Sequence, residues 1–212
     1  MYSREYYSNH DQGSYDSAIT ILSRLSAYVN PQSVIDIGCG SGTWCKAAMN
    51  VWGIVALGID QHSYEDCNMH IPESQYLQND IRSRVHGYHA DLVICVEVIE
   101  HIDEEYEDTV LDNICAMSNT ILFSGALPFQ GGTGHVNEKP YSYWVEKFNR
   151  RGFYLDERIR HDIWDDARVA IWYRNNIMLL HKNTNKNRMM HQHLDIIHPH
   201  MLERILRKRG FL

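Results

Sequence analysis

Apolar and polar positions follow one another along the chain in blocks that are typical of strands alternating with helices. Continuous apolar runs bounded by polar residues or glycine predict buried strands. Apolar residues spaced three or four positions apart predict helices between them. We expect strands at 34–37, 54–59, 75–78, 90–96, 120–126, 154–160 and 171–181, and helices at 17–29, 43–51, 104–117 and 141–151.

This alternation predicts the α/β class, with a doubly wound, mostly parallel seven-stranded sheet and helices on both faces. The 212 residues, of which 44% are hydrophobic, suffice for one such domain with a substantial core. A polar segment follows residue 182 and precedes a further helical pattern. We therefore expect a domain at 1–182, which includes an N-terminal lid helix, and a linker with a helical tail at 183–212.

Composition favours a cytoplasmic protein. No apolar run reaches the length of about 18 residues that a membrane span needs, and the first residues lack the apolar segment of a signal peptide. The five cysteines are an odd number without C-x-x-C spacing, which predicts reduced core thiols rather than a zinc site or disulfides. The net charge of −7 weighs against a nucleic-acid partner, because phosphate binding needs a basic surface. The oligomeric state, monomer or homodimer, stays open.

One segment combines a strand, a glycine-rich loop and the start of a helix. The apolar run at 34–37 contains an acid, Asp36, and leads into Gly38, Gly40 and Gly42. Glycines allow a ligand to approach the backbone, and the helix that follows presents its N-terminus to that ligand. The G-x-G-x-G spacing differs from the G-x-G-x-x-G of dinucleotide-binding loops.

Polar residues also follow the later strands. Asp60 ends the second strand, close to the spacing of about 20 residues at which an acid meets a ribose in βαβ units. Asp80 follows the third strand, and Glu97 follows the fourth. Because the carboxyl ends of parallel strands share one edge of the sheet, we expect these residues on the same rim as Asp36.

The glycine-rich loop and the polar residues after the later strands, in this order, resemble the class I S-adenosylmethionine-dependent methyltransferases. The resemblance implies a Rossmann-like fold and S-adenosylmethionine as cofactor, with Asp60 against the ribose hydroxyls and residues 79–81 near the adenine. The cofactor-binding residues that it implies are Asp36, Gly38, Cys39, Gly40, Trp44, Asp60, Gln61, Asp80, Ile81 and Glu97.

Further segments resemble one branch of this superfamily, found in polysaccharide and glycan pathways of bacteria and large DNA viruses. They are residues 127–138, 142–144, 163–165 and 172–176, and the likeness spans roughly 14–181. It implies O-methylation of a sugar hydroxyl on a glycan or sugar nucleotide. The loop that leaves the fifth strand is the expected substrate wall. We predict substrate contacts for Gln130, Asn137, Glu138 and Trp164.

A hydroxyl is a poor nucleophile until it loses its proton, so a base at the site adds rate. Two histidines lie on the predicted rim, and imidazole titrates near neutral pH. We favour His135 as the base because of its place in the glycine-flanked loop, with His101 as second choice. A divalent ion held by Glu100, His101 and His135 is the alternative, although no metal is predicted.

Other functions agree less well with the residues. Methylation of a nucleic acid, a protein or a non-sugar small molecule is the alternative. Amino-methylating nucleic-acid enzymes carry Asp/Asn-Pro-Pro-aromatic where this chain has 97–100, Glu-Val-Ile-Glu. A cofactor-binding module without activity is disfavoured because the whole set of cofactor residues is present. The tail histidines, His191, His193, His198 and His200, resemble a metal-binding tract, but an exposed helix face is favoured.

Overall fold

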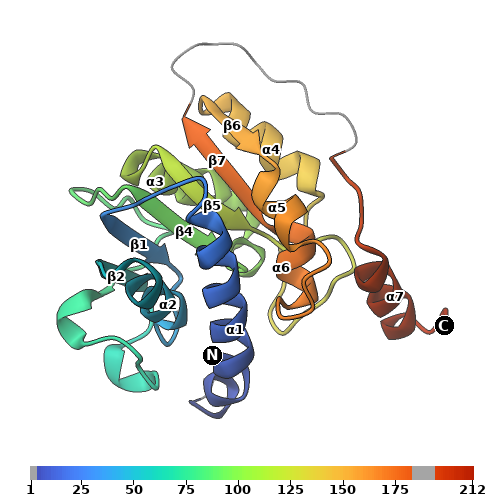
Figure 1. Ribbon diagram of the computed structural model, residues 1–212, viewed down its shortest axis with the longest axis horizontal. Helices are drawn as coiled ribbons and strands as arrows, with labels where there is room; N and C mark the ends of the chain where they lie inside the picture. The colour runs from blue at the N-terminus through green and yellow to red at the C-terminus, as the bar shows by residue number, and fades with distance from the viewer. Residues whose placement is uncertain (1–3, 183–193) are drawn as a thin grey trace.

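A seven-stranded sheet lies at the centre of the structure, with helices packed on both faces (Figure 1). The computed structural model describes residues 4–182 and 194–212, with side chains from Gln12 onward. The strand order is β3-β2-β1-β4-β5-β7-β6, in which β7 runs antiparallel to both neighbours and the other pairs are parallel. The strands are β1 Ser33–Ile37, β2 Val55–Asp60, β3 Tyr76–Gln78, β4 Leu92–Val96, β5 Thr120–Ser124, β6 Phe153–Asp156 and β7 Met178–Lys182. The predicted fold class is confirmed.

The helices divide between the two faces of the sheet. α1, α2 and α5 share a buried apolar cluster on one face, whereas α3, α4 and α7 contribute to the cluster on the other. The helices are α1 Arg4–Leu25, α2 Thr43–Trp52, α3 Glu107–Met117, α4 Tyr141–Arg150, α5 Arg158–Ile163, α6 Ile171–Asn176 and α7 Pro199–Lys208. Short 3₁₀ turns are η1 Tyr64–Asp66, η2 Glu73–Gln75, η3 Ile99–His101 and η4 Glu104–Tyr106.

Strand β4 shows why the central strands are apolar throughout. Successive side chains of a strand point to opposite faces. Val93 and Cys95 belong to the cluster beneath α3 and α4, whereas Leu92 and Ile94 belong to the cluster beneath α1 and α2. Both faces are covered, so no position along β4 can be polar without losing its solvation.

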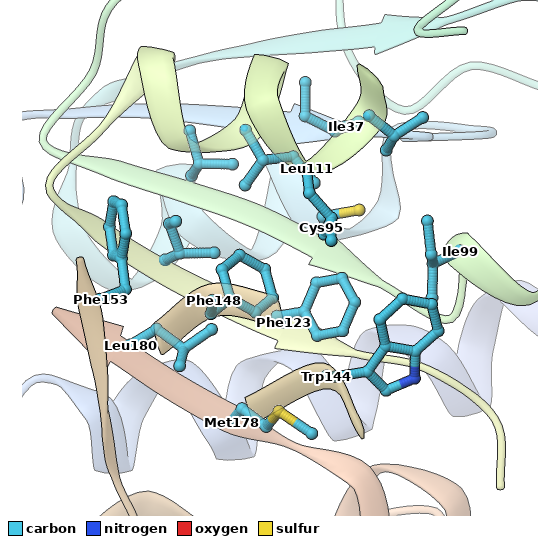
Figure 2. Packing of buried hydrophobic residues seen from close by; sticks show 14 of the residues in the cluster. Ile37, Cys95, Ile99, Leu111, Phe123, Trp144, Phe148, Phe153, Met178 and Leu180 are labelled. Carbon is cyan, nitrogen blue, oxygen red and sulfur yellow. The ribbon is translucent and has the colours of Figure 1, made fainter. Parts of the chain in front are cut away.

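Aromatic side chains fill the core beneath α4. Phe123 of β5 lies between Trp144 and Phe148 of α4, in edge-to-face contacts with centroid distances of 5.7 and 4.9 Å (Figure 2). All three side chains are fully buried. Such contacts add to the stabilisation from burial of apolar surface.

The last two predicted strands are wrong in part. The strand expected at 154–160 ends at Asp156, and α5 occupies the remainder. The buried positions Ile159 and Ile163 are one helical turn apart, so this helix shows its period only once. The strand expected at 171–181 begins at Met178, because α6 occupies Ile171–Asn176 first.

The two ends of the chain also differ in detail from expectation. The first helix is longer than predicted, since α1 already begins at Arg4. α7 packs Met201 and Ile205 into the cluster beneath the sheet, while the residues at 183–193 lie outside the described part. His198 is not on an exposed helix face, because it is buried at the start of α7. The division into a domain at 1–182 and a tail at 183–212 stays a prediction.

Two predictions from composition agree with the structure. The five cysteines are free thiols, and only Cys115 is partly exposed. Within residues 4–182 and 194–212, no helix is long and apolar enough to cross a membrane.

We expect Phe123→Ala to lower the free energy of unfolding by about 3–5 kcal/mol, because it opens a cavity between two rings of α4. Urea unfolding of parent and variant measures this difference. Phe211→Ala is the matched control: Phe211 is 75% exposed, and its loss should change stability by no more than about 0.5 kcal/mol. Equal effects of the two substitutions would contradict the assigned core.

Candidate functional site

A cavity of about 260 Å³ opens at the carboxyl ends of β1, β2 and β4. This edge is where open parallel sheets bind ligands. Nine of the residues predicted for cofactor or catalysis line it: Gly38, Cys39, Gly40, Asp60, Gln61, Asp80, Ile81, Glu97 and His101. The structure also brings residues to the wall that sequence reasoning missed: Ser14, Ser41, Thr43, His62, Val96, Val98, Ile102 and Tyr173.

The glycine-rich loop between β1 and α2 forms the floor of the cavity. Gly38 has φ +69°, and a Cβ there would lie 2.5 Å from Val98. Gly42 has φ +80°, and a Cβ there would lie 2.9 Å from Ile71. Both positions therefore require glycine for their conformation and for the close approach of neighbouring side chains.

Asp60 at the end of β2 faces this loop. Its carboxylate accepts a hydrogen bond from the backbone N–H of Gly40 at 2.9 Å and from Nδ1 of His62 at 2.8 Å. Burial alone would raise the pKa of Asp60, but the hydrogen bonds from His62 and Gly40 outweigh it and lower the pKa. Asp60 is therefore a carboxylate at neutral pH, and it is only 8% exposed. His62, two positions further on, was not predicted from sequence.

The segment after β3 supplies the next part of the wall. Asn79, Asp80 and Ile81 line the cavity together with Gln61. Asp80 forms a bidentate ion pair with Arg82, whose Nε and terminal nitrogen lie 2.9 and 2.7 Å from the two carboxylate oxygens. The hydrogen bonds from Arg82 lower the pKa of Asp80. Its carboxylate is thereby held in one orientation at the rim.

Two of the predicted cofactor residues lie behind the wall. Trp44 is buried against Tyr173, with ring centroids 5.3 Å apart, so it supports a side chain that lines the cavity. Asp36 is 2% exposed, and its carboxyl accepts a weak hydrogen bond from the thiol of Cys45. Burial raises the pKa of Asp36 to about 8. Asp36 is therefore a buried residue that is not part of the cavity lining.

Glu97 directly follows the end of β4, and three hydrogen bonds hold its side chain. Its side chain accepts hydrogen bonds from the hydroxyl of Ser124 at 2.8 Å and from the amides of Gln130 and Asn176 at 3.1 and 3.2 Å. Glu97 also has φ +54°, a rare conformation for a residue with a side chain. Such strain persists only where the surroundings fix the residue, and it is common at functional sites.

The two candidate histidines contact each other at the same edge. His101, on the turn η3, and His135, in the loop after β5, pack edge to face with centroids 4.9 Å apart. His101 lines the cavity, whereas His135, the first choice for the base, is not among the lining residues, so its role as base stays a prediction. Burial, with a contribution from His135, lowers the pKa of His101. His101 is therefore neutral at physiological pH.

The side chains of the predicted substrate residues form contacts with other residues of the protein. Glu138 accepts hydrogen bonds from the backbone N–H groups of Phe129 and Gly131 and from Nδ1 of His135. Gln130 is held by Glu97 and Asn176, and Asn137 donates to Glu107. Trp164 packs on Arg160 and His198. None of these four lines the cavity, so substrate contact by Gln130, Asn137, Glu138 and Trp164 stays a prediction.

Comparisons with known proteins identify a matching family and similar folds. A family model described as a methyltransferase domain matches residues 9–212. No curated protein matches the sequence. A magnesium protoporphyrin IX methyltransferase from Synechocystis PCC 6803, solved with bound S-adenosylmethionine, is 16% identical, with a TM-score of 0.57 over 82% of this chain and 80% of that one.

Two further solved structures are similar in fold. A sugar N-methyltransferase from Streptoalloteichus sp ATCC 53650 is 9% identical, with a TM-score of 0.64 over 84% of this chain and 92% of that one. An O-methyltransferase family protein from Burkholderia thailandensis is 12% identical, with a TM-score of 0.62 over 85% and 58%. At these sequence identities the similarity establishes the fold but not the acceptor of the methyl group.

We expect Asp36→Asn to stabilise the protein at alkaline pH. The native state keeps a proton on Asp36 up to about pH 8, whereas the unfolded chain loses it near pH 4, so stability falls as the pH rises between these values. The variant should exceed the parent by up to about 5 kcal/mol at about pH 8 and should match it near pH 4. Urea unfolding at both pH values measures the difference, with Asp103→Asn at an exposed position as control. A difference that does not change with pH would contradict this assignment.

Proposed function

The chain belongs to the methyltransferase domain family, and on that premise we propose that it transfers a methyl group from S-adenosylmethionine to a hydroxyl oxygen of a carbohydrate. One observation carries the proposal. A single cavity joins a nucleoside-type wall, made of the glycine loop and Asp60, to a neutral histidine, His101. The first part suits the cofactor, and the second suits an acceptor that must lose a proton.

The nucleoside part of the wall fits the cofactor in its donors and acceptors. Asp60 is ionised, and a carboxylate offers about four acceptor positions. The backbone N–H groups of Gly40 and His62 and the ring Nδ1 of His62 occupy three of them, so a ribose hydroxyl can donate to the remaining one. Gly38 and Gly40 line the cavity with their backbone alone. When bound, S-adenosylmethionine supplies a methyl group on a sulfonium, which already is a good electrophile. The chain therefore has to align the acceptor and exclude water.

The histidine part of the wall receives the acceptor. Transfer breaks the bond between sulfur and the methyl carbon, forms the bond between that carbon and the acceptor oxygen, and releases the hydroxyl proton. Nδ1 of His101 donates to the carbonyl of Gly134 at 3.3 Å, so Nε2 carries the lone pair. His135 packs against this ring and fixes it. We assign His101 and His135 together as the groups that activate the acceptor hydroxyl.

Carbohydrate is the acceptor class that we propose. The loop from Gln130 to Glu138 resembles that of methyltransferases from glycan pathways, and the net charge of −7 gives no support to a polyanionic acceptor. A protein, a nucleic acid or a non-sugar small molecule is the alternative acceptor, and the acceptor experiment below separates them. We propose the cytoplasm as the place of the reaction.

We expect Asp60→Asn to weaken binding of S-adenosylmethionine by about 1.5–3 kcal/mol, the worth of a hydrogen bond to a charged group. Calorimetry with the purified protein measures the affinity. Asp66→Asn, an exposed acid near Asp60 in the sequence that does not line the cavity, is the matched control and should bind like the parent. Equal affinities of parent and Asp60→Asn would remove Asp60 from the cofactor site.

We expect label from methyl-labelled S-adenosylmethionine to enter a carbohydrate as an O-methyl group. The acceptor panel should hold free sugars, sugar nucleotides and glycans, with the matching deoxy sugar as the control that lacks the accepting hydroxyl. Mass spectrometry of the product locates the methyl group. Transfer to DNA, RNA, protein or a non-sugar small molecule, with none to any carbohydrate, would overturn the proposed acceptor class.

A further inference from the structure

Glu100 is a carboxyl group that the fold buries without a hydrogen bond. Its side chain is 0% exposed, and neither of its oxygens has a hydrogen-bond partner among the described residues. The neighbouring acid Glu97, in contrast, accepts hydrogen bonds from Ser124, Gln130 and Asn176. Because an unsatisfied buried acceptor costs free energy, such a group needs an explanation, and a bound ion is one.

The two histidines beside Glu100 are oriented as metal ligands are. Nδ1 of His135 donates to the carboxylate of Glu138 at 2.9 Å, and Nδ1 of His101 donates to the carbonyl of Gly134 at 3.3 Å. Both rings therefore present the lone pair of Nε2. Metal-bound histidines almost always donate their other ring N–H to a carboxylate or a backbone carbonyl, which fixes the tautomer.

The three side chains converge on one point. One ligand atom from each of Glu100, His101 and His135 lies within 4.8 Å of the other two. The backbone holds them there, because the N–H groups of Val136 and Asn137 donate to the carbonyl of Glu100 at 2.8 and 3.1 Å.

We infer that Glu100, His101 and His135 bind a divalent first-row transition cation. Two imidazole nitrogens and one carboxylate are the ligand set that such cations occupy with coordination positions left open. Magnesium is a poorer match, since it prefers oxygen ligands.

Of the three ligands, His101 lines the cavity, so a cation held by them would lie beside the cavity wall. An acceptor hydroxyl bound there loses its proton to water more readily, since the cation stabilises the alkoxide, and the alkoxide then attacks the methyl group. This catalytic role rests on the proposed function, whereas the binding of the cation does not.

Titration of the purified full chain with Co²⁺, followed by visible absorption, tests the binding without cofactor or acceptor. We expect one Co²⁺ per chain. Glu100→Gln, His101→Ala and His135→Ala should each lower the affinity by more than about 100-fold. Glu138→Gln replaces one of the two oxygens that accept from His135, Phe129 and Gly131, and it should lower the affinity by about 10–100-fold. The double variant His191→Ala, His193→Ala is the matched control and should bind like the parent.

Two results would overturn the site. One is a parent that does not bind Co²⁺. The other is binding that Glu100→Gln and His101→Ala retain and the His191→Ala, His193→Ala variant loses. Glu100→Gln keeps the shape of the side chain, and circular dichroism with calorimetric binding of S-adenosylmethionine verifies that each variant is folded.

An activity measurement tests the catalytic role separately. Chelator treatment should abolish methyl transfer and leave binding of S-adenosylmethionine unchanged, and Co²⁺ or Mn²⁺ should restore turnover. Full turnover after removal of the metal would overturn the catalytic role. A parent that binds Co²⁺ at these residues but methylates no carbohydrate would contradict the proposed function and support the metal site.

Discussion

The clamped side chain of Glu97 is the interaction on which the functional edge of the sheet depends. Its donors come from three separate parts of the chain: Ser124 ends β5, Gln130 lies in the loop after it, and Asn176 ends α6. All three donors are neutral, so they stabilise the carboxylate without cancelling its charge. One half-buried side chain thereby holds together the end of β4, the loop after β5 and the end of α6.

The same network continues into the last helix. The amide of Asn175 donates to Asn176 at 2.8 Å, and the backbone N–H of His198 donates to Asn175 at 2.7 Å. At the other end of α7, Lys208 donates to the carbonyl of Gln130 at 3.4 Å. One end of α7 is therefore bound to α6 at Asn175, and the other end supports the loop after β5 at Gln130. Because buried polar networks lose much of their stability when one member is missing, displacement of α7 would loosen the wall at Glu97.

The sequence predicts those parts of the fold and site that one local pattern determines. Buried strands such as β4 are continuous apolar runs, and Gly38 and Asp60 stand at their ends, where topology brings them together. Helices of six residues, such as α5 and α6, are too short for an apolar period to be seen. The sequence also does not indicate whether a polar side chain faces a ligand or the protein itself. Glu138 and Gln130 are polar loop residues, yet their side chains form hydrogen bonds within the protein.

Glu97 and Glu100 show how two similar side chains, three residues apart, come to differ. The tight turn η3 follows β4 and places both acids at the same buried edge, where two uncompensated charges cannot coexist. Glu97 is given three hydrogen-bond donors, whereas burial and then the nearby Glu97 raise the pKa of Glu100 well above its ordinary value. The two acids therefore have different roles at one edge of the sheet. Glu97 holds three segments together, whereas Glu100 lies beside His101 and His135, with which it forms the inferred cation site.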